Sequence, residues 1–152
     1  MKLAMVINIY IDTQEGKVNG FDHPTSFKRF KEENTFIHTL RSINNLQLPV
    51  GDELSLYIFG IAVNQVLKHD RQIKIMLNEM MEESRFPYRI YTNSDIKRLK
   101  KATKSKFFAY DGYPEIRTLG LIIPTLLQED TIIQIDDDEL LRPDYLVALK
   151  KY

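Results

Sequence analysis

Four short apolar segments, each separated from the next by residues with helical character, constrain the fold of this chain more than any other feature. They are LAMVINIYI (3–11), LSLYIFGIAV (54–63), PYRIYT (87–92) and TIIQID (131–136). The first two are apolar at nearly every position, as strands are when helices cover both faces of a parallel sheet. Strands that alternate with helices build parallel sheets, so we expect an α/β protein, a three-layer α/β/α sandwich with a mostly parallel sheet.

The segments between these strands carry apolar residues at helical spacing. We expect helices over 33–46, over 71–83 with Asp70 as the N-cap, over 93–104, over 113–128 with a break or kink at Pro124, and after Pro143, which suits a first helical position. Residues 12–32 are polar and contain glycine and proline, which predicts a long loop.

Length and composition exclude several classes of protein. The 152 residues suit one domain, and 43% apolar with 28% charged residues predicts a packed core. Lys plus Arg and Asp plus Glu both number 21, which argues against a dedicated nucleic-acid binder. The absence of cysteine excludes a disulfide scaffold and a thiolate metal site, and favours the reducing cytoplasm. No apolar run reaches the roughly 18 residues that a bilayer crossing requires.

An acidic cluster, DDDE (136–139), directly follows the last apolar segment. Ligands of parallel α/β sheets bind beyond the carboxyl ends of the strands, where this cluster would lie. In an extended chain alternate side chains share a side, so Asp136 and Asp138 would face one way and Asp137 the other. Two such carboxylates make a seat for a hard cation, Mg²⁺ or Mn²⁺. The alternative is a solvated acidic turn that precedes a helix.

The acidic cluster lies within RTLGLIIPTLLQEDTIIQIDDDELLRPDYL (117–146), and this stretch resembles the central signature of the family 2 glycosyltransferases, which have the GT-A fold. RTLG (117–120) occupies the place of the family's Arg-Asn-x-Gly helix start, preceded by a turn glycine at Gly112. The acidic cluster occupies the Asp-x-Asp position, and PDYL (143–146) the helix after it. FIHTLRSINNL (36–46) is similar to the family's first helix, which often reads Leu-x-x-Thr-Leu-x-Ser-Leu.

The resemblance implies a Rossmann-like nucleotide-diphospho-sugar transferase. Such an enzyme transfers a sugar from a nucleoside diphosphate sugar to an acceptor, which is a glycan, lipid or protein, with the help of Mn²⁺ or Mg²⁺. By position, Asp136 and Asp138 would hold the metal, Asp138 most directly, and Asp137 would reach the donor ribose. Arg117 and Tyr10 would line the nucleotide site.

The chain departs from the family pattern at several positions. Asn64 stands where the family commonly has an aspartate that reads the base, and we expect it in the nucleotide site. Thr118 replaces the asparagine of Arg-Asn-x-Gly, and a long loop replaces the usual short turn after the first strand. The family's acceptor-binding half and catalytic base would lie beyond Tyr152. We therefore expect 1–152 to be one donor-binding domain truncated on its acceptor side, or a short homologue with altered function.

Other functions remain open. A nucleotidyltransferase would carry a glycine-rich basic loop after the first strand, which DTQEGKVNGFDH (12–23) matches only weakly, and a non-catalytic nucleotide-binding module would need only the donor site. The basic stretch KRLKKATKSK (97–106) is typical of a solvated helix face. It also suits contact with a phosphate-rich acceptor or with an anionic membrane, which would place a cytoplasmic protein on the inner membrane face.

Overall fold

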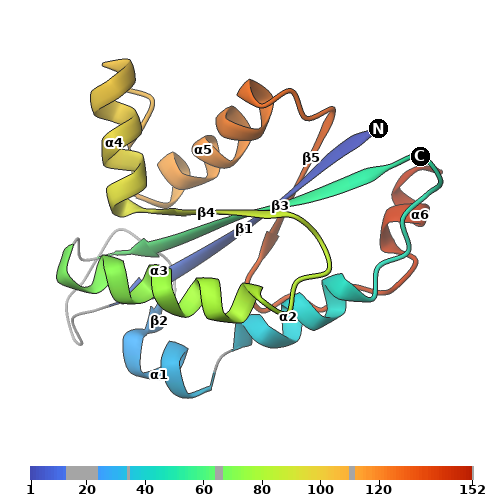
Figure 1. The fold of residues 1–152 in the computed structure, drawn as a ribbon, viewed down its shortest axis with the longest axis horizontal. Helices are drawn as coiled ribbons and strands as arrows, with labels where there is room; N and C mark the ends of the chain where they lie inside the picture. Colours follow the sequence, from blue (N-terminus) through green and yellow to red (C-terminus); the bar gives the residue numbers. More distant parts are fainter. Residues whose placement is uncertain (13–23, 34, 64–66, 110–111, 152) are drawn as a thin grey trace.

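The computed structural model describes residues 1–12, 24–33, 35–63, 67–109 and 112–151. Its centre is an open sheet in which all described strand pairs are parallel (Figure 1). The strands are β1 (Lys2–Asp12), β2 (Thr25–Ser26), β3 (Glu53–Ala62), β4 (Tyr88–Thr92) and β5 (Thr131–Asp136). Each apolar segment of the sequence therefore forms a strand, and the expected α/β class with a mostly parallel sheet is confirmed.

Strand β1 lies in the middle of the sheet. One edge of β1 pairs with β3 from Lys2 to Ile11, and β3 pairs in turn with β4. The other edge pairs with β5 from Leu3 to Asn8, and then with β2 at Ile11 and Asp12. The chain therefore continues to opposite sides of β1 when it forms β3 and β5. A reversal of this kind is the switch point at which α/β sheets bind ligands.

Helices lie on both sides of the sheet. They are α1 (Phe27–Glu32), α2 (Thr35–Asn44), α3 (Leu67–Met81), α4 (Asn93–Thr103), α5 (Tyr113–Leu126) and α6 (Tyr145–Leu149). In Figure 1, α1, α2 and α3 lie below the sheet, whereas α4 and α5 lie above it. Among the described residues, no helix combines the length and the apolar character needed to cross a membrane.

Alternate residues of β1 contribute to two separate cores. The odd-numbered residues from Leu3 to Ile11 pack with side chains of α1, α2, α3 and α6, whereas the even-numbered Ala4, Val6 and Tyr10 pack with side chains of α4 and α5. Burial on both faces explains why β1 is apolar at almost every position. It also fixes the register of β1, because a slip by one residue would exchange the two cores.

Residues 12–32 are not a loop throughout, because β2 and α1 lie within them. Ser26 caps α1, and its Oγ accepts a hydrogen bond from the Arg29 backbone N–H at 3.2 Å. Phe27 and Phe30 give the short helix an apolar side that packs into the core beside α2 and α3. The expected loop is therefore wrong for 25–32, while 13–23 lie outside the described residues.

The sequence predicted Asp70 as the N-cap of a helix over 71–83, and this prediction is wrong. Helix α3 begins at Leu67, and Asp70 lies in its first turn. The buried Asp70 carboxylate instead accepts hydrogen bonds from the Ser94 backbone N–H at 3.1 Å, from Ser94 Oγ at 2.6 Å and from Thr92 Oγ1 at 3.1 Å. It therefore supplies acceptors at the start of α4 and joins α3 to β4 and α4.

The two prolines lie at different places relative to their helices. Helix α5 continues through Pro124 to Leu126, so the helix does not break at this proline, although proline removes one backbone hydrogen-bond donor. Pro143 is not the first residue of α6, which begins at Tyr145. The Pro143 carbonyl accepts a hydrogen bond from the Gln47 backbone N–H at 2.8 Å, which holds this segment as a turn before the helix.

Helix α5 approaches the sheet closely at Gly120. A Cβ atom at this position would lie 2.8 Å from Val6 Cγ1 on β1 and 3.3 Å from Gln134 Nε2 on β5. Carbon atoms do not normally approach so closely, so a larger residue would push the helix away from the strands. The glycine therefore sets the height of α5 above the switch point.

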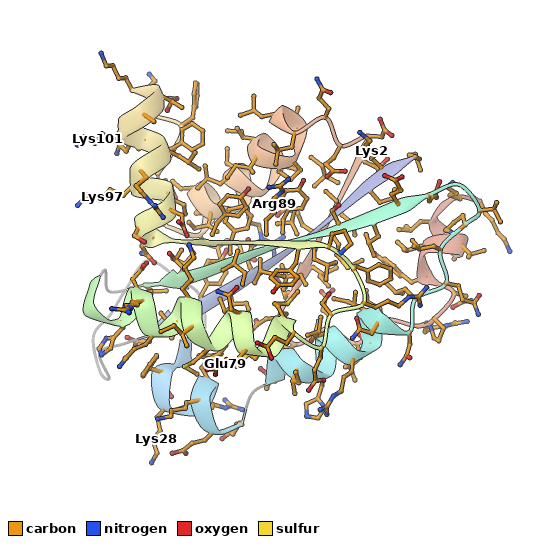
Figure 2. All side chains as sticks on the ribbon, viewed as in Figure 1. Lys2, Lys28, Glu79, Arg89, Lys97 and Lys101 are labelled. Carbon is orange, nitrogen blue, oxygen red and sulfur yellow. The ribbon has the colours of Figure 1, made fainter. Side chains whose placement is uncertain are left out.

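Replacing Asp70 with alanine tests its role at the start of α4. The variant removes the acceptor of the Ser94 backbone N–H and hydroxyl, whereas Thr92 keeps Asp95 as an acceptor, so we expect the free energy of unfolding to fall by about 2–3 kcal/mol. Urea denaturation measures this loss. The matched variant Glu79→Ala changes an exposed residue of the same helix (labelled in Figure 2) and should change stability by less than about 0.5 kcal/mol. Equal losses in the two variants would contradict the assignment.

Candidate functional site

An ion pair marks the switch point between β1 and β5. Asp136 is the last residue of β5, and its Oδ1 accepts a hydrogen bond from Arg117 Nη2 of α5 at 2.7 Å. The two side chains are 46% and 36% exposed, so solvent and ligands can reach both. Asp136 lies beside Asn8 of β1 in the parallel register, on the side of the sheet that α5 covers. The structure thus brings together two residues that the sequence assigned to one site.

Two tyrosines extend the ion pair toward β1. The Arg117 guanidinium lies over the ring of Tyr113, with Cζ 4.8 Å from the ring centroid. The Tyr113 ring in turn lies against Tyr10, with centroids 5.1 Å apart and planes tilted by 39°. Tyr10, Tyr113, Arg117 and Asp136 therefore form a continuous row from the end of β1 to the end of β5.

The charges of these groups follow from their surroundings. Burial, and then the neighbouring Tyr113, raise the pKa of Tyr10, so its hydroxyl stays protonated at neutral pH. Partial burial acts to lower the pKa of Arg117, but the Tyr113 side chain and the Asp136 carboxylate outweigh it and raise that pKa. Arg117 is therefore a permanent cation, and Tyr10 a neutral hydrogen-bond donor.

The acidic cluster turns as soon as the strand ends. Strand β5 stops at Asp136, and the Glu139 backbone N–H donates to the Asp136 carbonyl at 3.4 Å, closing a turn over 136–139. The expectation that Asp136 and Asp138 point the same way as in an extended strand does not apply, because Asp137 and Asp138 lie within the turn. Asp137 is half-buried, whereas Asp138 is exposed.

Helix α2 holds this acidic turn from the opposite side. Thr39 Oγ1 donates to the Asp137 carbonyl at 2.7 Å, and Ser42 Oγ accepts a hydrogen bond from the Leu141 backbone N–H at 3.1 Å. Thr39 and Ser42 are one turn apart on the helix and so meet the turn from the same side. They are the threonine and serine of the helix motif noted in the sequence. This pair gives the motif a physical role, since it fixes the position of the acidic turn.

The environment of Asp137 disfavours its charge. Burial raises the pKa of Asp137 to about 6; a backbone hydrogen bond opposes this shift, while the charges of Asp138 and Asp136 add to it. Burial also raises the pKa of Glu139, and so does the nearby Asp136. Four carboxyl groups therefore share the site with one guanidinium. The excess of negative charge favours a bound cation, which would relieve the repulsion.

A buried side-chain amide lies directly beneath the ion pair. Asn8 is only 1% exposed, and within the described part of the chain neither its Oδ1 nor its Nδ2 has a hydrogen-bond partner. Gln134 Oε1 and Arg117 Nε, on the same side of the sheet, are likewise buried without a partner there. Unpartnered buried polar atoms cost stability and are rare in folded proteins. Their concentration at the switch point makes this a place where a bound ligand or water would gain hydrogen bonds.

The residues of the site could supply some, but not all, of the ligands of the metal ion expected from the sequence. Asp136 gives Oδ1 to Arg117 and keeps Oδ2 available, and Asp138 is exposed. Within the described ranges, no three His, Asp or Glu side chains form a group that could hold a metal ion. The carboxylates therefore offer part of a shell of hard oxygen ligands, of the kind that Mg²⁺ and Mn²⁺ complete with water and phosphate.

The sequence identified part of this site and missed another part. It named Asp136, Asp137, Asp138, Arg117 and Tyr10, which all lie at the switch point, and it named Asn64, which lies outside the described residues. It missed Tyr113 and Asn8. Tyr113 precedes Arg117 by four positions, the spacing at which helical side chains meet. Asn8 is the only polar residue within the first apolar segment.

Comparison of this chain with protein-family models, with curated proteins and with solved structures finds no match. The geometry of the switch point and the sequence resemblance are therefore the basis for the function proposed below.

Replacing Asn8 with alanine tests whether its amide lacks partners. Because no described protein group bonds to the two polar atoms that the variant removes, we expect the free energy of unfolding to fall by no more than about 1 kcal/mol. Ile7→Ala, at the adjacent and equally buried position, should cost about 2–5 kcal/mol. Urea denaturation of both variants measures the difference. A loss at Asn8 as large as that at Ile7 would show that the amide is hydrogen-bonded.

The raised pKa of Asp137 predicts a pH-dependent gain from Asp137→Asn. The folded pKa of about 6 lies above the ordinary 3.8, so the folded protein binds this proton more tightly than the unfolded chain. The resulting stability is present below about pH 4 and is lost as the pH rises through 6. Asparagine stays neutral, so the variant should gain about 1–3 kcal/mol at pH 7 and almost nothing at pH 4.

Urea denaturation at the two pH values measures this gain. The exposed Glu82, at the end of α3, supplies the control variant Glu82→Gln. A gain for Asp137→Asn that is the same at both pH values would contradict the raised pKa.

Proposed function

We propose that this chain is the donor-binding domain of a metal-dependent glycosyltransferase, which transfers a sugar from a nucleoside diphosphate sugar to a glycan, lipid or protein acceptor. The proposed fold is the three-layer GT-A arrangement of the family 2 glycosyltransferases. The observation that carries the proposal is the Arg117–Asp136 ion pair at the switch point, followed at once by Asp137 and Asp138. It joins a fixed cation to a group of carboxylates where α/β sheets bind nucleotides.

Arg117 is the residue suited to the diphosphate. One of its nitrogens binds Asp136, and the partly exposed guanidinium has further N–H groups that can donate to phosphate oxygens. The contacts with Asp136 and Tyr113 hold the guanidinium in place before a ligand arrives. Less side-chain entropy is then lost on binding, which raises affinity.

The carboxylates are suited to the cation and to the sugar hydroxyls. Asp138 and the second oxygen of Asp136 would hold Mg²⁺ or Mn²⁺, which when bound supplies positive charge that neutralises the diphosphate leaving group. Asp137 would accept a hydrogen bond from the donor ribose. Tyr10, kept protonated by burial, would face the nucleoside. The ordering of the acidic turn by Thr39 and Ser42 supports these roles, because it presents the carboxylates at a fixed place.

Calorimetry with UDP, GDP and their sugar conjugates, with and without Mn²⁺, tests this proposal. We expect one nucleotide class to bind in a Mn²⁺-dependent manner. Arg117→Gln and Asp138→Asn should each weaken binding by about 10- to 100-fold, the value of a charge-assisted contact. Glu53 is an exposed carboxylate at the amino-terminal end of β3, the end of the sheet away from the site, so Glu53→Gln should bind like the wild type.

Failure of the folded wild-type protein to bind any of these nucleotides with Mn²⁺ present would refute the proposal. A second readout separates the two forms that it can take. Release of free sugar from the bound donor would support a transferase. Metal-dependent binding without any sugar release or transfer would instead assign the chain as a non-catalytic donor-binding module.

A further inference from the structure

Helix α4 and the residues after it carry a concentrated basic surface, which the proposed donor site does not use. We define this basic surface by its side chains: Lys97, Arg98, Lys100, Lys101, Lys104 and Lys106. All six are exposed. Figure 2 shows Lys97 and Lys101, one helical turn apart, pointing away from the rest of the molecule.

The lysines of the basic surface have no ion-pair partner among the described residues. Residues 97–106 contain no acidic side chain, and among the described residues only Arg98 of the six forms an ion pair, with Asp95. The rest of the chain carries an acidic excess of six, because these ten residues hold six of the 21 basic residues. The molecule is neutral overall, but its positive charge is concentrated at α4 and its negative charge lies elsewhere. A negatively charged surface would therefore orient the molecule with α4 toward itself.

The helix is rigidly attached, so the basic surface has a defined shape. Ile96 is buried in the core with α5, and Asp95 accepts hydrogen bonds from Lys74 of α3 at 2.8 and 3.0 Å. The lysines therefore lie on the side of α4 that does not contact the rest of the protein. Lys100, Lys101, Lys104 and Lys106, together with Ser105, line a surface hollow of about 340 Å³.

An exposed aromatic residue adjoins these lysines. Phe107 is 64% exposed, whereas the next residue, Phe108, is 5% exposed and packs in the core with Tyr10. The chain is thus anchored by one phenylalanine and presents the other beside the basic surface. Lysines that attract phosphate groups and an aromatic ring that can enter the interface are the two signals that peripheral membrane proteins combine.

From the exposed, unpaired lysines and the adjoining phenylalanine, we propose that the basic surface and Phe107 bind the surface of an anionic lipid bilayer. The positive charge favours an anionic partner, and Phe107 can enter the apolar part of a bilayer interface. A dedicated nucleic-acid binder would also show a basic excess over the whole domain, which this chain lacks. The proposal is independent of the donor site, because vesicle binding requires neither nucleotide nor metal.

Co-sedimentation with lipid vesicles tests the proposal. The whole chain should bind vesicles of phosphatidylcholine with about one third phosphatidylserine, and should not bind pure phosphatidylcholine. Binding should weaken steeply when the salt concentration rises from about 0.1 M to about 0.5 M. Absence of binding to the anionic vesicles by folded protein at the lower salt concentration would overturn the proposal.

Matched charge reversals locate the contact. The double variant Lys97→Glu and Lys101→Glu should lose at least about tenfold in vesicle affinity. The double variant Lys28→Glu and Lys31→Glu reverses two exposed lysines of α1, on the other side of the sheet, and should bind like the wild type (Figure 2). Phe107→Ser should lose several-fold in affinity. Thermal unfolding followed by circular dichroism checks that all variants are folded.

Three outcomes would contradict the assignment. Equal losses in the two double variants would show that binding follows net charge and not this surface. Complete displacement of the protein from vesicles by millimolar inorganic phosphate would assign the hollow to a small anion. Tighter binding to a short nucleic-acid duplex than to anionic vesicles, lost in Lys97→Glu and Lys101→Glu, would assign the surface to nucleic acid.

Discussion

Burial of β1 on both of its faces and pairing along both of its edges is the constraint on which the other parts of the structure depend. The strand divides the apolar side chains into two cores and so determines which helices lie on which side of the sheet. It also carries Asn8 and Tyr10, on the side covered by α5, to the place where β5 ends. The candidate site is therefore positioned by a strand that is paired along both edges and buried on both faces, which suits a site that binds a ligand in one geometry.

The acidic turn shows how the fold tolerates repelling charges. Arg117 neutralises Asp136, the last residue of β5, while Thr39 and Ser42 hold the backbone of the turn. Within the described residues no cation pairs with Asp137, and burial, together with the charges of Asp138 and Asp136, raises its pKa. Groups that a protein keeps at such a cost are often groups that bind or react.

The sequence predicted the strands better than the contacts between elements. Apolar runs locate β1, β3, β4 and β5, because burial on both faces leaves a signal at every position. Capping and turn geometry depend on partners that are distant in sequence, and these cannot be read from spacing. Asp70 precedes an apolar helical pattern and so resembles its cap, yet its donors lie in Thr92 and Ser94. The extended spacing assumed for the acidic cluster fails because the chain turns at Asp136.

The same distinction applies within the candidate site. Asp136 and Arg117 were assigned to one site from a family resemblance, as a metal ligand and as a residue of the nucleotide site. Tyr113 was missed because a tyrosine at a helix start carries no distinctive signal of its own. Asn8 does carry such a signal, since a single amide within an apolar strand is costly unless something binds it.

The close approach of α5 at Gly120 has a consequence for evolution. The missing side chain at this position sets the distance between helix and strands, and Arg117 lies less than one turn away on the same helix. A substitution that adds even one carbon atom would place that atom 2.8 Å from Val6 Cγ1, so that either Val6 or the helix that carries Arg117 would have to move. Gly120 carries no polar group, yet a substitution there can change the geometry of the ion pair. The site can therefore be lost during evolution through this glycine while Arg117 and Asp136 are retained.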